Sequence, residues 1–123
     1  MSDEQINIAI AEACGWGFSE TAVSYPNGLK IQFHPPEYVK EVFLKEIPDY
    51  CNDLNAMHEA EQTKEMLWNS DYSWWLGRVC TTQRGFDPDK QEEIEQMKIG
   101  QFATARQRAE AFLRTIGKWE EAK

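Results

Sequence analysis

The sequence has no long hydrophobic run and no closely spaced cysteines, and each absence argues against a class of protein. No apolar stretch approaches the roughly 20 residues that a membrane-spanning helix needs, so no membrane partner is expected. The first residues contain neither a basic nor an apolar segment, so a secretory signal peptide is not expected. Cys14, Cys51 and Cys80 form no Cys-x-x-Cys pair, which argues against a disulfide framework and a zinc site. We expect reduced, mostly buried thiols and no cofactor.

Motifs of nucleophilic catalysis and phosphate transfer are also missing. The chain contains no Gly-x-Ser-x-Gly, no P-loop and no Gly-x-Gly-x-x-Gly. His58 has no second histidine at helical spacing, which a helical zinc site of the His-Glu-x-x-His type requires. The acidic residues between Asp53 and Glu65 are more typical of a solvated helix face than of an acid–base pair. The sequence therefore favours a protein that binds over one that catalyses.

Basic residues are few relative to acidic ones. Lys and Arg number 13 against 21 Asp and Glu, which gives a net charge of −8. A protein this acidic repels a phosphate backbone, so duplex nucleic acid is not expected as a partner. Such a charge suits solubility or association with a basic partner. With 123 residues, 41% of them hydrophobic, the chain is long enough for one domain with its own core.

The clearest predicted element is a helix over 104–119. Thr104 and Gln107 have the spacing of a capping box, and Gly117 stands where glycine commonly ends a helix. One face of this helix is apolar and must be buried; it consists of Ala105, Ala109, Phe112, Leu113 and Ile116. The same combination of capping box, apolar face and terminal glycine predicts a second helix over 3–14.

A β-hairpin is predicted between these helices. Residues 18–25 and 29–33 alternate apolar and polar side chains on either side of Asn27-Gly28, a strong hairpin signal. We expect one face of the hairpin to be buried, with Leu29, Ile31 and Phe33 on it. Residues 37–47 fit both a short helix and a short strand, and the pattern slightly favours the helix.

The second half of the chain predicts mostly helix. One helix, capped by Asn52 or Asp53, should extend to about residue 68, and another, capped by Ser70 or Asp71, to about residue 80. An acidic loop is predicted over 82–96 and a short strand over 97–102. The order of elements predicts a single α+β domain over 1–123, with a small antiparallel sheet sandwiched between helices.

Two groups of residues are candidates for a ligand site. Arg106 and Arg108 lie near a predicted helix N-terminus, where free N–H groups and two guanidinium groups favour an anion such as a phosphate. Arg106, Glu110 and Arg114 also have the spacing of an ion-pair ladder, which is the structural alternative. In Trp74-Trp75 the side chains leave a helix about 100° apart, so one is expected in the core and its neighbour exposed at a groove or an interface.

Three stretches of the sequence resemble the phage ABA sandwich domain, a family of small bacteriophage proteins. They are EQINIAIAEACGW at 4–16, PDY followed by DLNAMHEAE within 48–61, and ATARQRAEAFL at 103–113. The resemblance implies an α/β/α sandwich and a phage or prophage origin, and it carries no catalytic residue. Its polar positions are either site residues or parts of buried networks between the helix layers; they are Tyr50, Asp53, Asn55, His58, Arg106 and Glu110.

Together these features predict a non-catalytic phage accessory protein that acts in the host cytoplasm against host defence. In the first hypothesis it sequesters a nucleotide-type signal, with phosphate held by Arg106 and Arg108 and the base stacked on Trp16, Trp74 or Trp75. In the second it inhibits a host defence protein through its acidic surface, centred on 87–95. A small nucleotide hydrolase is the third hypothesis. A homo-oligomer formed through the Trp74-Trp75 segment is a further possibility.

Overall fold

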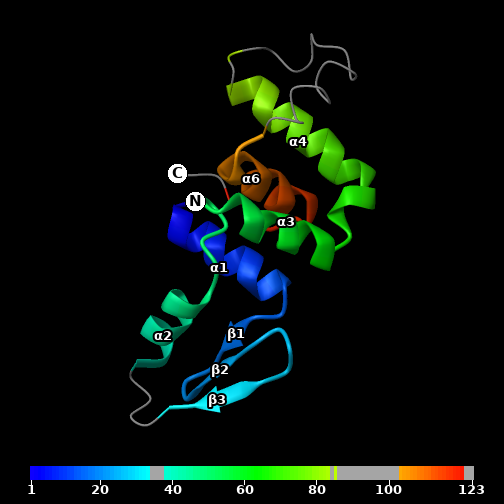
Figure 1. Ribbon diagram of the computed structural model, residues 1–123. Helices are drawn as coiled ribbons and strands as arrows, with labels where there is room; N and C mark the ends of the chain where they lie inside the picture. The colour runs from blue at the N-terminus through cyan, green and yellow to red at the C-terminus, as the bar shows by residue number, and fades with distance from the viewer. Residues whose placement is uncertain (34–37, 84, 86–102, 121–123) are drawn as a thin grey trace.

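The computed structural model describes residues 1–33, 38–83, 85 and 103–120 (Figure 1). Within them the chain forms five α-helices and a three-stranded antiparallel sheet, so the predicted α+β class is confirmed. In chain order the elements are α1 (Asp3–Ala13), β1 (Gly17–Phe18), β2 (Ala22–Ser24), β3 (Lys30–Gln32), α2 (Val39–Glu46), α3 (Leu54–Thr63), the 3-10 helix η2 (Met66–Trp68), α4 (Ser70–Gln83) and α6 (Ala105–Thr115).

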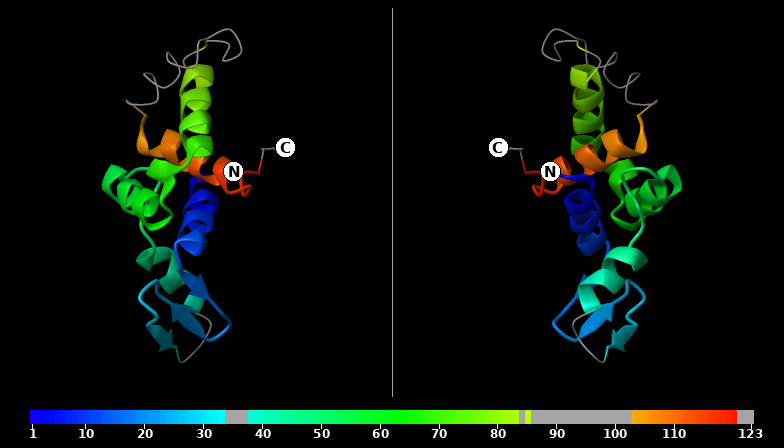
Figure 2. Two further views of the ribbon diagram at one scale, coloured as in Figure 1. Left: turned by 90° about the vertical axis from the view of Figure 1, so that its right-hand side faces the viewer. Right: turned by 90° about the vertical axis from the view of Figure 1, so that its left-hand side faces the viewer.

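The sheet and the larger group of helices lie at opposite ends of an elongated molecule. Figures 1 and 2 show the sheet and α2 at one end, α3, α4 and α6 at the other, and α1 between them. Helix α2 packs on β1 and β2, with the rings of Phe18 and Phe43 4.6 Å apart. Helices α4 and α6 pack mainly on each other. The layering therefore differs from the expected sandwich, because α2 packs on the sheet while α3, α4 and α6 pack mainly with other helices.

Helix α6 lies at the centre of the helical end. The predicted capping box is confirmed: Thr104 Oγ1 accepts from the Gln107 backbone N–H at 3.2 Å, and Gln107 Oε1 accepts from the Thr104 N–H at 2.9 Å. Phe112 and Leu113 are fully buried, and α6 packs on α1, α3 and α4. The helix ends at Thr115, Ile116 is its cap and Gly117 has a φ of 75°, so the predicted position of this glycine at the helix end is confirmed.

Helix α1 is built in the same way. Ser2 and Gln5 form the predicted capping box, and Ile6 and Ile10 are fully buried. After the helix, Gly15 has a φ of 105°, and a Cβ at this position would lie 3.3 Å from Pro26 Cα. Glycine is therefore required here both by the backbone conformation and by the close approach of the hairpin.

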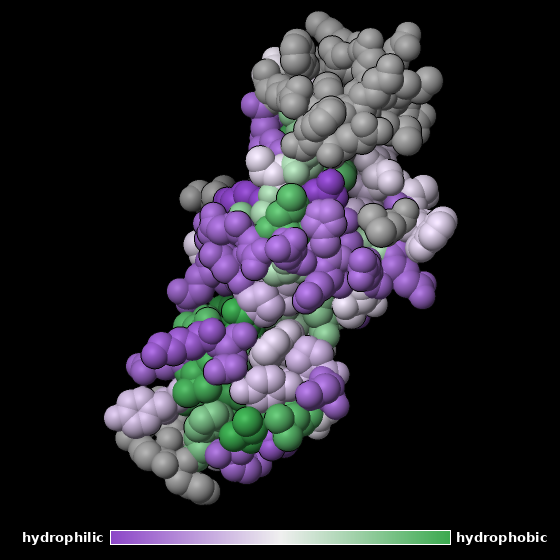
Figure 3. Space-filling view, in the orientation of Figure 1, coloured by the Kyte–Doolittle hydropathy of each residue, from purple (hydrophilic) through white to green (hydrophobic). Residues whose placement is uncertain are grey.

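The predicted hairpin is formed by β2 and β3, with Val23 opposite Ile31. The predicted first strand, 18–25, is divided in the structure: its start lies in the two-residue strand β1, which pairs with β2. The predicted burial is wrong for the second strand: Leu29 is 52% exposed and Ile31 38% exposed, and Phe33 is half-buried. The reason is that α2 packs on β1 and β2, and no described helix packs on β3 to a comparable extent. Figure 3 shows hydrophobic side chains on the surface at this end of the molecule.

The ambiguous segment 37–47 contains helix α2, in which Val39 and Phe43 are buried one turn apart.

Asp53 is the cap of α3, since its Oδ1 accepts from the Asn55 and Ala56 N–H groups at 3.0 and 3.4 Å. Helix α3 ends at Thr63 and not near residue 68, because Glu65 adopts a left-handed φ of 54° before η2 begins.

Helix α4 differs from its prediction at both ends. Its first N–H groups donate to Asn69 Oδ1, from Asp71 at 2.8 Å and Tyr72 at 3.4 Å, so Asn69 is the cap and not Ser70 or Asp71. At the other end the helix continues to Gln83, so the first two residues of the predicted loop 82–96 are helical. Apart from residue 85, the rest of that loop and the predicted strand 97–102 lie outside the described residues.

Candidate functional site: a pocket between α4 and α6

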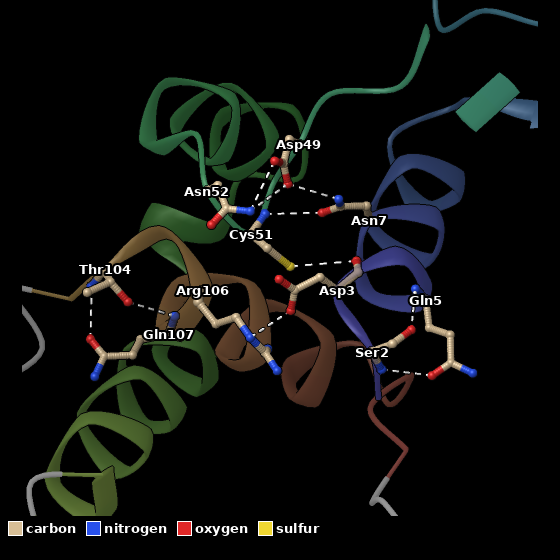
Figure 4. A network of polar contacts seen from close by, with 10 residues as sticks. All are labelled: Ser2, Asp3, Gln5, Asn7, Asp49, Cys51, Asn52, Thr104, Arg106 and Gln107. Carbon is tan, nitrogen blue, oxygen red and sulfur yellow. Dashed lines mark hydrogen bonds and ion pairs between the residues drawn. The ribbon is translucent and has the colours of Figure 1, made fainter. Parts of the chain in front are cut away.

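Arg106 and Arg108 point to different helices. Arg106 Nε lies 3.0 Å from Asp3 Oδ1, a partly exposed ion pair that joins α6 to α1 (Figure 4). Arg108 Nη1 donates to both carboxylate oxygens of Glu61, on α3, at 3.2 and 3.3 Å. Each guanidinium group thus has a carboxylate partner on another helix. The expected phosphate clamp, in which both groups face one anion at the start of α6, is not assembled.

The Arg108 pair is part of a buried polar network. The Glu61 side chain is 1% exposed and that of Arg108 14% exposed, and Tyr72, from α4, is also buried beside them. Burial, followed by the charge of Glu61, raises the pKa of the Tyr72 hydroxyl well above its ordinary value. The hydroxyl therefore stays protonated. The Glu61–Arg108 ion pair thus joins α3 to α6, and Tyr72 of α4 lies beside it.

Four other predicted site residues lie elsewhere on the molecule. Trp16 packs against Tyr25, with ring centroids 5.0 Å apart, and Tyr50 is 3% exposed in the core. Asn55 and His58 are exposed on α3. None of the four lines the pocket described below. Tyr50 is therefore a core residue, Trp16 is partly buried against the core, and Asn55 and His58 belong to a solvated helix face.

Trp74 and Trp75 contact each other at the surface of α4. Their ring centroids are 4.8 Å apart and their planes meet at 81°. Trp74 is 45% exposed, and the guanidinium carbon of Arg78 lies 5.0 Å from its ring centroid. Trp75 is half-buried. The two side chains thus differ in exposure, as their helical spacing predicts.

A pocket of about 320 Å³ opens between α4 and α6 beside Trp75. This volume is at the lower end of the range of about 300–1,000 Å³ for ligand pockets, which fits a mononucleotide-sized ligand better than an extended one. The pocket is lined by one indole, two guanidinium groups, one carboxylate and neighbouring side chains: Trp75, Arg78, Val79, Thr82, Gln83, Glu110 and Arg114.

Contacts with described residues of α4, α6 and the C-terminal segment fix Arg114 on the wall of this pocket. Its Nε donates to Glu110 Oε2 at 3.2 Å, one helical turn away. Its guanidinium carbon lies 5.2 Å from the ring centroid of Trp75 and 5.2 Å from that of Trp119. A guanidinium group held in this way loses little freedom when it binds an anion.

The described lining residues give the pocket a local charge opposite to that of the chain. Two guanidinium groups and one carboxylate leave one positive charge (2 − 1 = +1), whereas the whole chain carries −8. An aromatic face next to fixed cations suits a ligand that has both a planar ring and an anionic group. The predicted ladder is half formed: Glu110 pairs with Arg114, while Arg106 pairs with Asp3.

Sequence reasoning identified Trp75 and Glu110 but missed Arg78 and Arg114 as pocket residues. The missed signal is the placement of Arg78 three residues after Trp75 on one helix face, whereas the spacing of Glu110 and Arg114 was recognised only as that of an ion pair. These two pairs belong to helices that are distant in sequence. Only the packing of α4 on α6 brings them to one pocket.

A second pocket, of about 440 Å³, has the opposite electrostatic character. Asp3, Glu4 and Asp49 line it together with Lys45, so it disfavours anions. Beside it Asn7 is fixed from two sides: its Nδ2 donates to Asp49 Oδ1 at 3.0 Å, and its Oδ1 accepts from a backbone N–H at 3.1 Å (Figure 4). These bonds anchor the segment before α3 on α1, which is a structural role.

Comparison of the sequence with protein-family models and with curated proteins, and of the fold with solved structures, finds no match. The resemblance to the phage family therefore stays a prediction. Among the described residues, no three or more His, Cys, Asp and Glu side chains are grouped so as to hold a metal ion. In the same part of the chain, no helix combines the length and the hydrophobicity needed to cross a membrane.

Proposed function

We propose that the protein binds a small anionic ligand of nucleotide type in the pocket between α4 and α6 and sequesters it without chemical change. The observation that carries this proposal is the position of Arg114, which is held between two indole rings at the wall of a pocket that also contains Arg78. Trp75 supplies a face for base stacking, and the two guanidinium groups attract the phosphate. The ligand thus contacts one aromatic side chain and two guanidinium groups.

The proposed ligand class is the one predicted from the sequence, but the proposed site lies further along α6 than the predicted one. Arg106 and Arg108 hold Asp3 and Glu61, and Arg114 takes the phosphate-binding role two turns later in the same helix. The resemblance to phage proteins supplies the biological setting of the proposal. In that setting the protein is made in the host cytoplasm and keeps a nucleotide signal from a host defence system.

The ligand itself is the first test. Protein isolated under native conditions is expected to release on denaturation a small molecule that absorbs in the nucleobase band and matches the mass difference between the native and denatured protein. An Arg78→Ala, Arg114→Ala double variant, isolated in the same way, is expected to release much less. Equal release from both proteins would place the ligand elsewhere. Release from neither, with no binding of added mononucleotides, would count against the proposal.

A second candidate function, inhibition of a basic protein partner, is favoured by Trp68. Its side chain is 90% exposed, three residues after the left-handed residue Glu65. An exposed tryptophan that stands between the acidic residues Glu65 and Asp71 in the sequence suits a partner surface with arginine or lysine beside an apolar hollow. The predicted centre of this surface, 87–95, lies outside the described residues. For this candidate, partner binding should weaken with rising salt and in Trp68→Ala.

A further inference from the structure

Glu110 is the acceptor that a ligand base meets in the pocket. With the base stacked on Trp75, base identity is read by the polar groups that face its edge. Glu110 is the carboxylate among the described lining residues; its side chain is 17% exposed and held by Arg114 Nε. An ionised carboxylate can only accept hydrogen bonds, so it favours a base edge that carries N–H donors.

From this chemistry we propose that the pocket prefers guanine over adenine and that Glu110 is the residue that discriminates between them. This inference rests on the proposed function. Guanine presents two adjacent donors, N1–H and the N2 amino group, which match the two oxygens of a carboxylate. Adenine presents one amino group beside N1, whose lone pair a carboxylate repels.

Gln83 supports the same choice from the other helix. Its Oε1 accepts a hydrogen bond from Gln107 Nε2 at 2.9 Å, which fixes the orientation of the amide on the pocket wall. The amide nitrogen is then the group of Gln83 that complements an acceptor such as guanine O6. A donor on α4 and an acceptor on α6 together match the sequence of acceptor and donors along the guanine edge.

The test is calorimetric titration of the protein with GMP, AMP and ribose 5-phosphate, the last as a base-free probe. The native protein is expected to bind GMP at least about tenfold more tightly than AMP. Glu110→Gln should bring this ratio close to one. Glu110→Asp keeps a carboxylate and should keep a preference for GMP. Glu59→Gln removes the same charge from an exposed position on α3 and should leave the ratio unchanged.

The outcomes separate this inference from the function on which it rests. If the native protein binds GMP and AMP equally, or if Glu110→Gln keeps the native ratio while its circular dichroism shows a folded protein, the inference is overturned and nucleotide binding stands. If none of the three probes binds, both proposals are overturned. Since the readout is a ratio within one protein, a general loss of affinity in a variant does not imitate the expected result.

Discussion

Arg108 reaches from α6 to α3, where its Nη1 donates to both oxygens of the Glu61 carboxylate at 3.2 and 3.3 Å. Both side chains are removed from water almost completely, with Glu61 1% exposed and Arg108 14% exposed. A charge buried to this extent is stable only next to its partner. The pair therefore fixes how two helices sit against each other, and it explains why Arg108 does not serve a ligand.

The first prediction concerns this pair. Arg108→Met leaves the Glu61 carboxylate buried without its partner, so we expect it to lower the free energy of unfolding by about 3–5 kcal/mol. The double variant Glu61→Leu, Arg108→Met replaces the pair by apolar groups and should recover most of the loss. Urea unfolding of the single and double variants measures both values. A single variant as stable as the native protein would contradict the structural role of the pair.

The contrast between Arg108 and Thr104 shows which features can be predicted from sequence. The cap that Thr104 forms depends on Gln107, three residues away, and the same holds for Ser2 and Gln5 at α1. Such local signals identified both helices. The partner of Arg108 is 47 residues away, and only packing of α6 on α3 brings the two together. A phosphate clamp and a buried ion pair have the same local sequence.

The predicted burial of the second hairpin strand was wrong for a related reason. Alternation along a strand shows which residues share a face, and that face is buried only where another element covers it. Helix α2 covers β1 and β2, and β3 remains at the edge with Ile31 exposed. The position of α2 depends on contacts such as that of Phe18 with Phe43, which the pattern of the hairpin does not contain.

The second prediction concerns the difference in burial between β2 and β3. Val23 is fully buried and Ile31, directly opposite it on β3, is 38% exposed, so the two positions form a matched pair. We expect Val23→Ala to lower the free energy of unfolding by about 2 kcal/mol, from lost burial and the cavity left behind. Ile31→Ala should lower it by less than about 1 kcal/mol. Equal losses in urea unfolding would show that β3 is covered in solution.

The third prediction concerns the turn after α3. Glu65 has a φ of 54°, a conformation that costs a non-glycine residue about 1–2 kcal/mol. Glu65→Gly removes this strain and makes the unfolded chain more flexible, so a net gain of up to about 1 kcal/mol is expected. Gly117→Ala is the opposite change, at a φ of 75°, and should destabilise the protein. If thermal unfolding shows Glu65→Gly to be the less stable protein, the left-handed turn is absent in solution.

The fourth prediction is a loss of stability at alkaline pH caused by Cys51. Burial, followed by the charge of Asp3, raises the pKa of this thiol from 9.0 to about 11. The folded state thus holds the thiol proton more tightly than the unfolded state. The resulting stability is complete below pH 9 and is lost as the pH rises toward 11.

Cys51→Ala provides the comparison for this pH effect. Between pH 8 and 10, below the ordinary tyrosine pKa of 10.0, the native protein should lose more free energy of unfolding than the variant. Cys14, whose pKa burial also raises, accounts for part of the remaining loss in the variant. Urea unfolding at several pH values gives both curves. Parallel curves would show that the Cys51 thiol is not protected in the folded protein.

The pocket between α4 and α6 is tested most directly by calorimetric titration of GMP into the native protein, Arg114→Ala and Arg106→Ala. Both variants remove one guanidinium group from α6, but only Arg114 lines the pocket, while Arg106 forms a partly exposed ion pair of small energetic weight. We predict that Arg114→Ala weakens binding about 10- to 100-fold, as expected for a lost charged hydrogen bond, and that Arg106→Ala leaves it within about twofold. Weaker binding in Arg106→Ala with unchanged binding in Arg114→Ala would contradict the proposed site.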